Sequence, residues 1–314
     1  MTKGKRIPTR PMAALALLMA LGLGCASSKE QKSKPLFGTP MSNNSSDSNA
    51  IAAAAAADGA NAARVAREAG PYAEGKCAGL LTQEYGPEEE QTIGATVWAS
   101  RAPKEGALPP DARVSKVGMK LAKVSARPEL PWRFAVFQSD AVDSFSAPGG
   151  TVGVTTGLLA KASTDAQLAG VLAHEIGHVV LKHPLLRYRD VKHHQCVAAH
   201  TAAYVIEHGG PKSPATDQTA AYARSFDGTA AQDAQGQKFS AFLMDAFLQM
   251  LKFGYDRDTE FQTDRTGFEL LTLAGFDPAE YEKLLTSLGT KDDDRVAKLK
   301  VLRESRPKDT RKKR

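Results

Sequence analysis

Two different periods of hydrophobic residues follow each other along the chain. Glu88 to Trp98 and Val114 to Ala126 carry apolar residues at helical spacing, and this pattern predicts two helices. Pro131 to Phe137 is instead rich in aromatic and branched residues, and Phe145 to Thr156 contains a glycine turn that runs into a similar segment. The sequence therefore predicts a strand, a turn and a second strand ahead of the next helix.

The helix that follows these strands has a well-marked start. Thr164 is followed three residues later by Gln167, which is the pattern of a capping box. The apolar residues of this helix fall on one stripe, whereas His174 and His178 lie off it. The stripe consists of Leu168, Leu172, Ile176 and Val179. We therefore expect a helix that buries the stripe and directs its two histidines elsewhere.

Helical patterns dominate the rest of the chain. His183 to His208 continues as a helix, while Gly209 to Gly236 is small and polar and predicts a surface insertion. Phe239 to Phe253 is a strongly apolar helix, and Arg257 to Ala274 forms another that ends at Gly275. The expected fold class is α+β, a mostly helical domain with a small β-sheet packed on the histidine-bearing helix.

The two ends of the chain differ from its centre. Basic residues precede the apolar run Met12 to Gly24, which is too short to span a bilayer and predicts a signal peptide over 1–24. Cys25 follows in a lipobox-like context and predicts lipidation; ordinary signal cleavage and an uncleaved anchor are the alternatives. Ser27 to Ala60 has too few large apolar residues to fold. We expect a disordered tether over 25–75, one folded domain over 76–300 and a basic tail over 301–314.

The charge of the chain argues against a nucleic-acid partner. The net charge is +6 at pH 7, but four of the basic residues lie in the signal and six lie in residues 306–314. Without these two ends the body is slightly acidic, so no basic face is available for a duplex. We expect the tail to be a solvated end or a weak contact with anionic surfaces.

Two cysteines remain after Cys25. Export would place Cys77 and Cys196 in an oxidising compartment, where a disulfide can form and persist. Two buried free thiols are the alternative that the sequence leaves open.

The segment His174-Glu175-Ile176-Gly177-His178 has the residues of a zinc hydrolase. Residues four apart lie on one face of a helix, so both histidines can bind one ion, and Glu175 reaches the water that the ion holds. A third ligand is needed, and all seven histidines lie between positions 174 and 208, so a ligand further along must be a carboxylate. Glu260 answers this need, and Asp264, one turn later, can orient a ligand imidazole.

With these residues in place, the chain resembles the gluzincin peptidases of metallopeptidase family forty-eight. The resemblance covers residues 85 to 285, and its motifs occur in the order of the family. They are His174-Glu-x-x-His178, Glu260-x-x-x-Asp264, the strand motif Asp143 to Gly150, Gly157-Leu158-Leu159, and Ala274 to Pro278. The chain departs from the family at Thr263, where alanine is usual, and at Arg306, which replaces the histidine of a Ser-His-Pro stretch. No fourth histidine ligand is therefore expected.

The resemblance implies a zincin-like fold and one zinc ion per subunit. According to this resemblance, His174, His178 and Glu260 would bind the metal. Glu175 would be the general base, and Asp264 would orient His174. The strand at Gly150, Thr151, Val152, Gly153 and Val154 would be an exposed edge beside the HExxH helix, where a substrate chain pairs by main-chain hydrogen bonds.

Several of these assignments keep a plainer alternative. Glu260 could belong to a solvated acidic turn, and the strand glycines could serve only a hairpin turn and a bulge. The remaining histidines, from His183 onward, are more often surface or supporting groups than ligands. The candidates for stabilising the oxyanion are Tyr255, Arg257 and Arg265.

The resemblance and the signal together predict a zinc-dependent metalloendopeptidase that acts on polypeptides of the cell envelope. The expected location is the periplasm, with a lipid anchor in the outer membrane. The competing hypothesis is a non-proteolytic, zinc-containing lipoprotein that acts as an assembly or chaperone-like factor.

Overall fold

The computed structural model describes residues 61–65, 67–101, 108–209, 217, 220–227, 234–251, 254–289 and 293–305. The predicted signal, Cys25, most of the predicted tether and Arg306 lie outside these residues. The chain divides into two compact units, one formed by residues 1–83 and 189–245 and the other by 84–188 and 246–314. The sequence analysis expected a single folded domain, so the second unit is a new feature.

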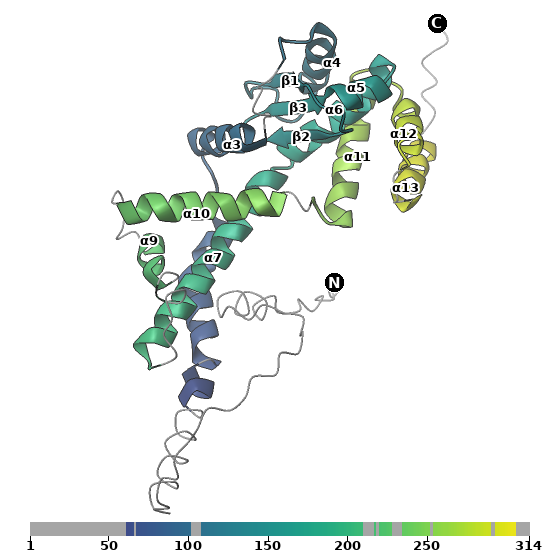
Figure 1. Cartoon of the computed structure of the whole chain (residues 1–314). Helices are drawn as coiled ribbons and strands as arrows, with labels where there is room; N and C mark the ends of the chain where they lie inside the picture. The colour runs from purple at the N-terminus through teal and green to yellow at the C-terminus, as the bar shows by residue number, and fades with distance from the viewer. Residues whose placement is uncertain are drawn as a thin grey trace, which may run out of the picture. The chain divides into compact units, whose positions relative to one another are not determined.

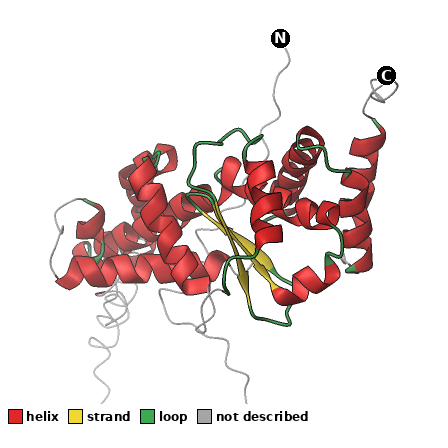
Figure 2. Cartoon of the chain, turned by 90° about the horizontal axis from the view of Figure 1, so that it is seen from above, coloured by secondary structure: helices red, strands yellow, loops and turns green. Residues whose placement is uncertain are grey.

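The unit of residues 84–188 and 246–314 is mostly helical with one small sheet (Figures 1 and 2). The prediction of an α+β fold is therefore confirmed. Its elements begin with α3 (Pro87–Arg101), α4 (Ala112–Ala122), β1 (Arg133–Phe137), β2 (Ser144–Ala147), β3 (Thr151–Thr155), α5 (Thr156–Lys161) and α6 (Asp165–Val180). They end with α11 (Arg257–Leu273), α12 (Pro278–Ser287) and α13 (Asp293–Glu304).

The three strands of the sheet have the order β1-β3-β2. β2 and β3 form an antiparallel hairpin, while β1 pairs in parallel with the other side of β3, so that Ala135 lies opposite Gly153. The prediction that residues 150–154 form an exposed edge is therefore wrong, because both sides of β3 are occupied. The edge strand that flanks α6 is β2. The parallel pairing joins segments distant in sequence, and the pattern within each segment does not reveal it.

The glycines of this hairpin serve the turn, as the plainer alternative had it, and close packing in place of the bulge that it also named. Gly149 and Gly150 have φ angles of 81° and 94°, which favour glycine. A Cβ at Gly153 would lie 2.7 Å from the ring of Phe137 and 2.8 Å from that of Phe145. These positions therefore need glycine for the fold itself.

The core of this unit is built around α6. Thr164 caps the helix as predicted, because its side chain accepts a hydrogen bond from the backbone nitrogen of Gln167. The predicted stripe is buried: Leu168, Leu172 and Ile176 are fully covered and Val179 is 1% exposed. Helices α4, α11 and α12 pack on α6, and β2 and β3 lie against it as well. Since α6 is covered on most sides, its two histidines are held in a rigid setting.

The described residues of the other unit form helices and turns, with no strand among them. Residues 61–65 and 67–77 are helical and continue into η1 (Ala78–Thr82); α9 (Ala223–Phe226) also lies here. Helices α7 (His183–Glu207) and α10 (Ala234–Leu251) contribute residues to both units. None of the described helices is long and apolar enough to cross a membrane.

The helix ahead of Cys77 shows that the expected end of the tether, at residue 75, is too late. Val65, Ala69, Ala73 and Cys77 recur every four residues and are all buried. A disulfide joins Cys77 to Cys196 on α7, with the two Cα atoms 5.9 Å apart. This bridge decides between the two alternatives for the cysteines, and it fastens the helix to its unit.

Candidate active site

The two histidines of the HExxH segment converge on one point. His174 and His178 lie one turn apart on α6, are buried, and have their Nε2 atoms 3.2 Å apart. Two imidazole nitrogens at this separation can bind a single ion.

Helix α11 brings the third ligand to the same point because it approaches α6 closely. A Cβ at Gly267 would lie 3.2 Å from the backbone nitrogen of His174, and one at Gly177 would lie 3.0 Å from the Thr263 side chain. Because Gly177 and Gly267 have no side chain, the backbones of α6 and α11 can approach each other closely where the helices cross. Glu260, in the first turn of α11, consequently places its Oε2 atom 3.3 Å from His174 Nε2.

The three side chains fit a zinc ion. Ligands bound to zinc at 2.0–2.1 Å in a tetrahedron lie about 3.3 Å from one another. The Nε2 atoms of His174 and His178 are 3.2 Å apart. Glu260 Oε2 lies 3.3 Å from His174 Nε2, and Glu260 Oε1 lies 3.9 Å from His178 Nε2. Two imidazoles and one carboxylate are a donor set that suits zinc, and three ligands leave one position open for water or substrate. The alternative of a solvated acidic turn is wrong for Glu260, because its side chain faces both histidines.

Asp264 fixes the orientation of His174, as predicted. It is fully buried, and its Oδ1 atom lies 2.9 Å from His174 Nδ1, which donates in the tautomer that leaves Nε2 free for a metal. Burial alone would raise the pKa of Asp264, but hydrogen bonds with His174 and Arg295 lower it. The carboxylate therefore stays charged in the interior.

Arg295 on α13 is a residue of the site that the sequence analysis missed. Its Nη2 atom donates to Asp264 Oδ1 at 2.7 Å and lies 3.1 Å from both His174 Nδ1 and the hydroxyl of Tyr281. A signal was present in the sequence, since Arg295 shares a helix face with Leu299, which is 1% exposed. The arginines considered from the sequence were Arg257 and Arg265, as candidates for the oxyanion, and Arg306, which replaces a histidine of the family and lies outside the described residues.

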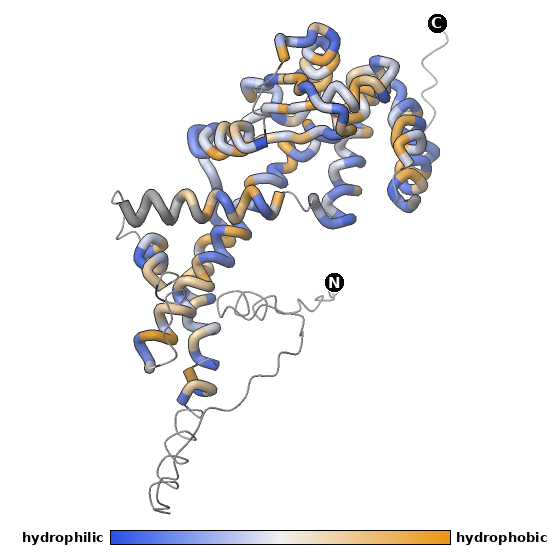
Figure 3. Tube along the Cα trace, viewed as in Figure 1, coloured by the Kyte–Doolittle hydropathy of each residue, from blue (hydrophilic) through white to orange (hydrophobic). Residues whose placement is uncertain are grey.

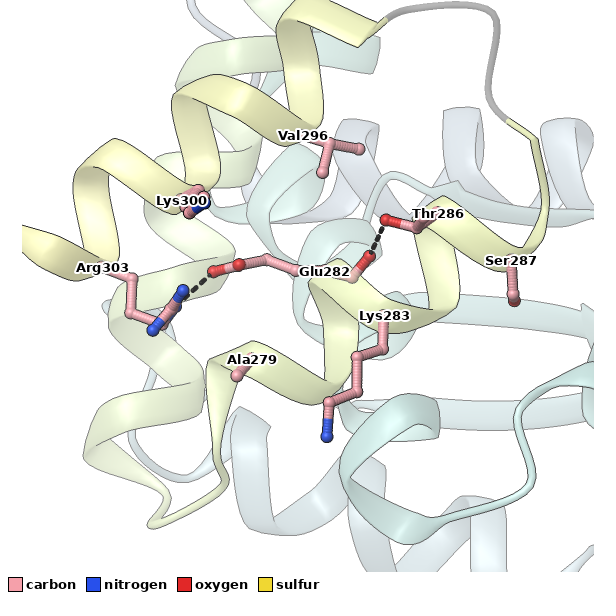
Figure 4. Close-up of a pocket in the computed structure, with 8 residues that line it drawn as sticks. All are labelled: Ala279, Glu282, Lys283, Thr286, Ser287, Val296, Lys300 and Arg303. Atoms are coloured by element: carbon pink, nitrogen blue, oxygen red, sulfur yellow. Dashed lines mark hydrogen bonds and ion pairs between the residues drawn. The ribbon is translucent and has the colours of Figure 1, made fainter.

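A surface pocket on the outer side of α12 and α13 holds none of these site residues (Figure 4). Both helices mix apolar and polar residues along their length (Figure 3). Within the pocket, Arg303 Nε donates to Glu282 Oε1 at 2.8 Å and so ties α13 to α12. We interpret the pocket as a groove between α12 and α13, the latter of which carries Arg295.

His183 supports the second ligand. It is buried, and its Nδ1 atom lies 3.1 Å from His178 Nδ1 and 3.1 Å from the hydroxyl oxygen of Thr263. Burial lowers the pKa of His183, and a hydrogen bond with Gln262 raises it by less, so the ring stays neutral. The unprotonated Nδ1 of a neutral His183 can accept a hydrogen bond from His178 Nδ1–H, which leaves His178 Nε2 free for a metal. Thr263, expected to be of little consequence, contacts this pair.

Glu175 is buried beside the metal ligands and opposite the edge strand. Ser144 on β2 donates a hydrogen bond of 2.7 Å to Glu175 Oε1, and Ser146 also hydrogen-bonds it. Burial raises the pKa of Glu175, and the charge on His174 and the two serines offset only part of this effect. A carboxylate with a raised pKa can accept a proton and later return it, which is what a general base needs.

Of the three candidates for the oxyanion stabiliser, Tyr255 lies at the site. Its ring stacks on His178 with the centroids 4.5 Å apart, and the guanidinium of Arg187 lies 4.8 Å from the same ring. Burial raises the pKa of Tyr255 well above its usual range, so the phenol keeps its proton. Arg257 is exposed, and Arg265, with a side chain 67% exposed, lies beside Glu269.

The histidines after His183 belong to the other unit, and none of them lies at the site or contacts His174 or His178. His193 and His200 are buried beside Glu74 and Asp227, so of the two expected positions, surface or supporting, neither has the surface one. His200 also lies near Cys77 and Cys196, but a disulfide occupies both sulfur atoms.

Comparison with known proteins agrees with this geometry. The model of "Peptidase family M48" matches residues 109–311 of the chain, which is well over half of its length. The chain belongs to peptidase family M48. The resemblance found in the motifs is thus confirmed.

Three relatives illustrate how far the similarity extends. The chain is 25% identical over 175 residues to the beta-barrel assembly-enhancing protease of Escherichia coli (strain K12), covering 56% of this chain and 32% of the relative. It is 28% identical over 165 residues to the mitochondrial metalloendopeptidase OMA1 of Schizosaccharomyces pombe, covering 52% and 40%. It is 28% identical over 167 residues to the metalloprotease YcaL of Escherichia coli (strain K12), covering 51% and 54%. The chain thus spans between a third and about half of these curated relatives.

Zinc binding should depend on pH because His174 is charged in the metal-free protein. Burial lowers the pKa of His174, but hydrogen bonds with Asp264 and Glu260 outweigh the effect of burial and raise this pKa to about 9. Zinc binds neutral imidazole, so it must displace this proton, and we expect its apparent affinity to rise about tenfold per pH unit from pH 7 to 9. Competition with a chelator across this range measures the effect. Asp264→Asn should flatten the dependence, and a constant affinity in the unaltered protein would contradict it.

Replacement of His183 should weaken the metal site without unfolding the unit. We expect His183→Ala to lose about 10- to 100-fold in zinc affinity, because His178 Nδ1 loses the neighbour that fixes its tautomer. Zinc titration and circular dichroism together measure affinity and fold. His208→Ala, an exposed histidine of the other unit, is the control and should bind zinc as before; equal affinity in both variants would rule out the supporting role.

Proposed function

We propose that this chain is a zinc-dependent metalloendopeptidase that hydrolyses peptide bonds of polypeptide substrates. The observation that carries the proposal is Glu175, a buried carboxylate with a raised pKa, held by Ser144 beside the ligands. A structural zinc site has four protein ligands and needs no base. Here, within the described residues, three ligands converge and a base stands next to them. Membership of family M48 supports the same activity.

The protein side chains divide the proton transfers among themselves. Zinc, when bound, would supply a Lewis acid that polarises the scissile carbonyl and lowers the pKa of a water molecule. Glu175 would take the proton of the attacking water and pass it to the leaving amine. The raised pKa of Glu175 suits it to hold that proton between the two events. Asp264 and His183 would keep the two imidazoles in the tautomers that leave Nε2 free.

The edge of β2 is where we place the substrate. The inner side of β2 pairs with β3, and no described strand pairs with its outer side. A peptide that adds to this edge would make main-chain hydrogen bonds next to Ser144 and Ser146, whose hydroxyls contact Glu175. Its scissile bond would then lie beside the base. This replaces the edge first assigned to residues 150–154.

Tyr255 is the residue that we propose for the oxyanion. Its ring lies against His178, with the centroids 4.5 Å apart, and burial raises the pKa of the phenol so that it keeps its proton. A neutral phenol donates a hydrogen bond to the developing negative charge.

The cellular setting rests on the beginning of the sequence. We propose that residues 1–24 direct export, that Cys25 is lipidated, and that the enzyme works in the periplasm, attached to the outer membrane. Polypeptides of the cell envelope are the proposed substrates. Similarity to a protein named beta-barrel assembly-enhancing protease supports this choice.

Replacement of the base should abolish hydrolysis and leave the metal in place. In Glu175→Gln we expect casein cleavage to fall by about 10²- to 10⁴-fold, because the amide cannot accept the proton of the attacking water. Zinc content should stay at one per chain, since Glu175 is not a ligand. Glu269→Gln, on the outer face of α11, is the matched control. Undiminished cleavage by Glu175→Gln would show that Glu175 is not the base, whereas a zinc-loaded unaltered chain that does not cleave casein would support a non-proteolytic assembly factor.

Removal of one hydroxyl tests the role of Tyr255. Tyr255→Phe keeps the ring on His178, and we expect kcat to fall by about 10²- to 10³-fold with little change in KM, because the donor acts only in the transition state. Steady-state kinetics and zinc content measure the two effects. Tyr72→Phe, in the other unit, should behave like the unaltered enzyme. An unchanged kcat in Tyr255→Phe would remove Tyr255 from the mechanism.

A further inference from the structure

The two faces of β2 carry different side chains. Ser144 and Ser146 turn toward Glu175 on α6, and Phe145, between them, turns to the opposite face of the sheet. On that face its ring lies 5.4 Å from Trp98 and 5.7 Å from Phe137, measured between centroids. Strand alternation therefore separates a catalytic face from an aromatic one.

The aromatic face is open to solvent in part. Phe137 is 1% exposed and forms its floor, whereas Trp98 and Phe145 are only half-buried. Trp98 reaches the sheet from α3, which packs on β2 (Figure 1). None of the three belongs to the core around α6. We call Trp98, Phe137 and Phe145 the aromatic shelf.

A cation borders the shelf. The guanidinium of Arg101 lies 5.0 Å from the centre of the Phe145 ring and 3.6 Å from the carboxylate of Asp143. Its side chain is 28% exposed. A second cation placed on the shelf would meet this charge, so the shelf disfavours lysine and arginine.

We propose that the aromatic shelf is a specificity subsite that selects a large apolar or aromatic side chain of the substrate. This inference rests on the proposed function and on the pairing of the substrate with β2. A strand added to the edge of β2 alternates its side chains between the two faces, and the residue opposite Phe145 points to the same face as Phe145. Aromatic rings pair favourably with aromatic or branched neighbours across strands, and Trp98 lies on the same face, with its ring 5.4 Å from that of Phe145.

The position of this subsite along the substrate follows from the strand. Phe145 lies between the two serines that contact Glu175, so the selected residue is close to the scissile bond. Its immediate neighbours in the substrate point to the face of α6 and do not reach the shelf. Selectivity should therefore be confined to one position, with no matching preference at the residues on either side.

The test uses the full chain loaded with zinc and a set of quenched fluorescent peptides. One phenylalanine is moved residue by residue along an otherwise serine- and threonine-based peptide, and serine or lysine replaces it in matched peptides. We expect kcat/KM about tenfold higher for phenylalanine than for serine at one position only, and lysine to be the poorest. Trp98→Ala and Phe145→Ala should abolish the preference, and Trp98→Phe should keep it. Leu273→Ala, which truncates an exposed apolar side chain on α11, is the control and should keep it too.

Casein cleavage, zinc content and thermal unfolding are measured on every variant. If the unaltered enzyme cleaves casein but shows no preference, or if the preference survives in both alanine variants, the shelf is not a specificity subsite and the proposed activity stands. If a preference for acidic residues appears and is lost in Arg101→Ala, the cation selects the substrate and the shelf does not. If the zinc-loaded chain cleaves neither casein nor any peptide, the proposed function itself is overturned.

Discussion

The buried carboxylate of Asp264 is the interaction on which the site depends. An unpaired charge in the interior is costly, so Asp264 requires partners, and it finds them in His174 and Arg295. These three residues lie on α6, α11 and α13. One buried charge thus links three helices, and it fixes the ring that would bind the metal. The same pairing lowers the pKa of Asp264 and raises that of His174 to about 9 in the metal-free protein.

The rest of the site is built around this arrangement. Glycines at the crossing of α6 and α11 bring Glu260 to within 3.3 Å of His174 Nε2. On the other side of α6, β2 supplies Ser144 to the base and leaves its outer edge unpaired among the described strands. The side chains that we propose as metal ligands and base, and the strand edge that we propose for the substrate, are consequently held by elements of the core, and the Tyr255 ring from the loop before α11 stacks on His178. A site on packed helices and strands keeps its geometry with little reorganisation.

The features that the sequence predicted correctly are those with local causes. The cap at Thr164, the buried stripe of α6 and the two histidines four apart follow from the period of one helix. Glu260 and Asp264 could also be found from the sequence, because no histidine follows position 208. A pair of carboxylates one turn apart can supply the third metal ligand and the group that orients an imidazole. The predictions that were wrong depend on contacts between residues distant in sequence. β3 is central because β1 pairs with its far side, and Arg295 reaches Asp264 only once α13 packs in place. The helix of residues 67–77 is hard to predict because its buried positions are mostly alanine, and the disulfide to Cys196 holds it in its unit.

Anomalous diffraction at the zinc edge, from crystals of the full chain grown with zinc, tests the central claim most directly. We expect one strong peak bound by His174 Nε2, His178 Nε2 and a Glu260 oxygen, each at about 2.0–2.2 Å, with a non-protein ligand in the fourth position. Asp264 and His183 should lie behind the two imidazoles and not touch the metal. A peak without Glu260 among its ligands, or a fourth protein ligand that closes the site, would contradict it.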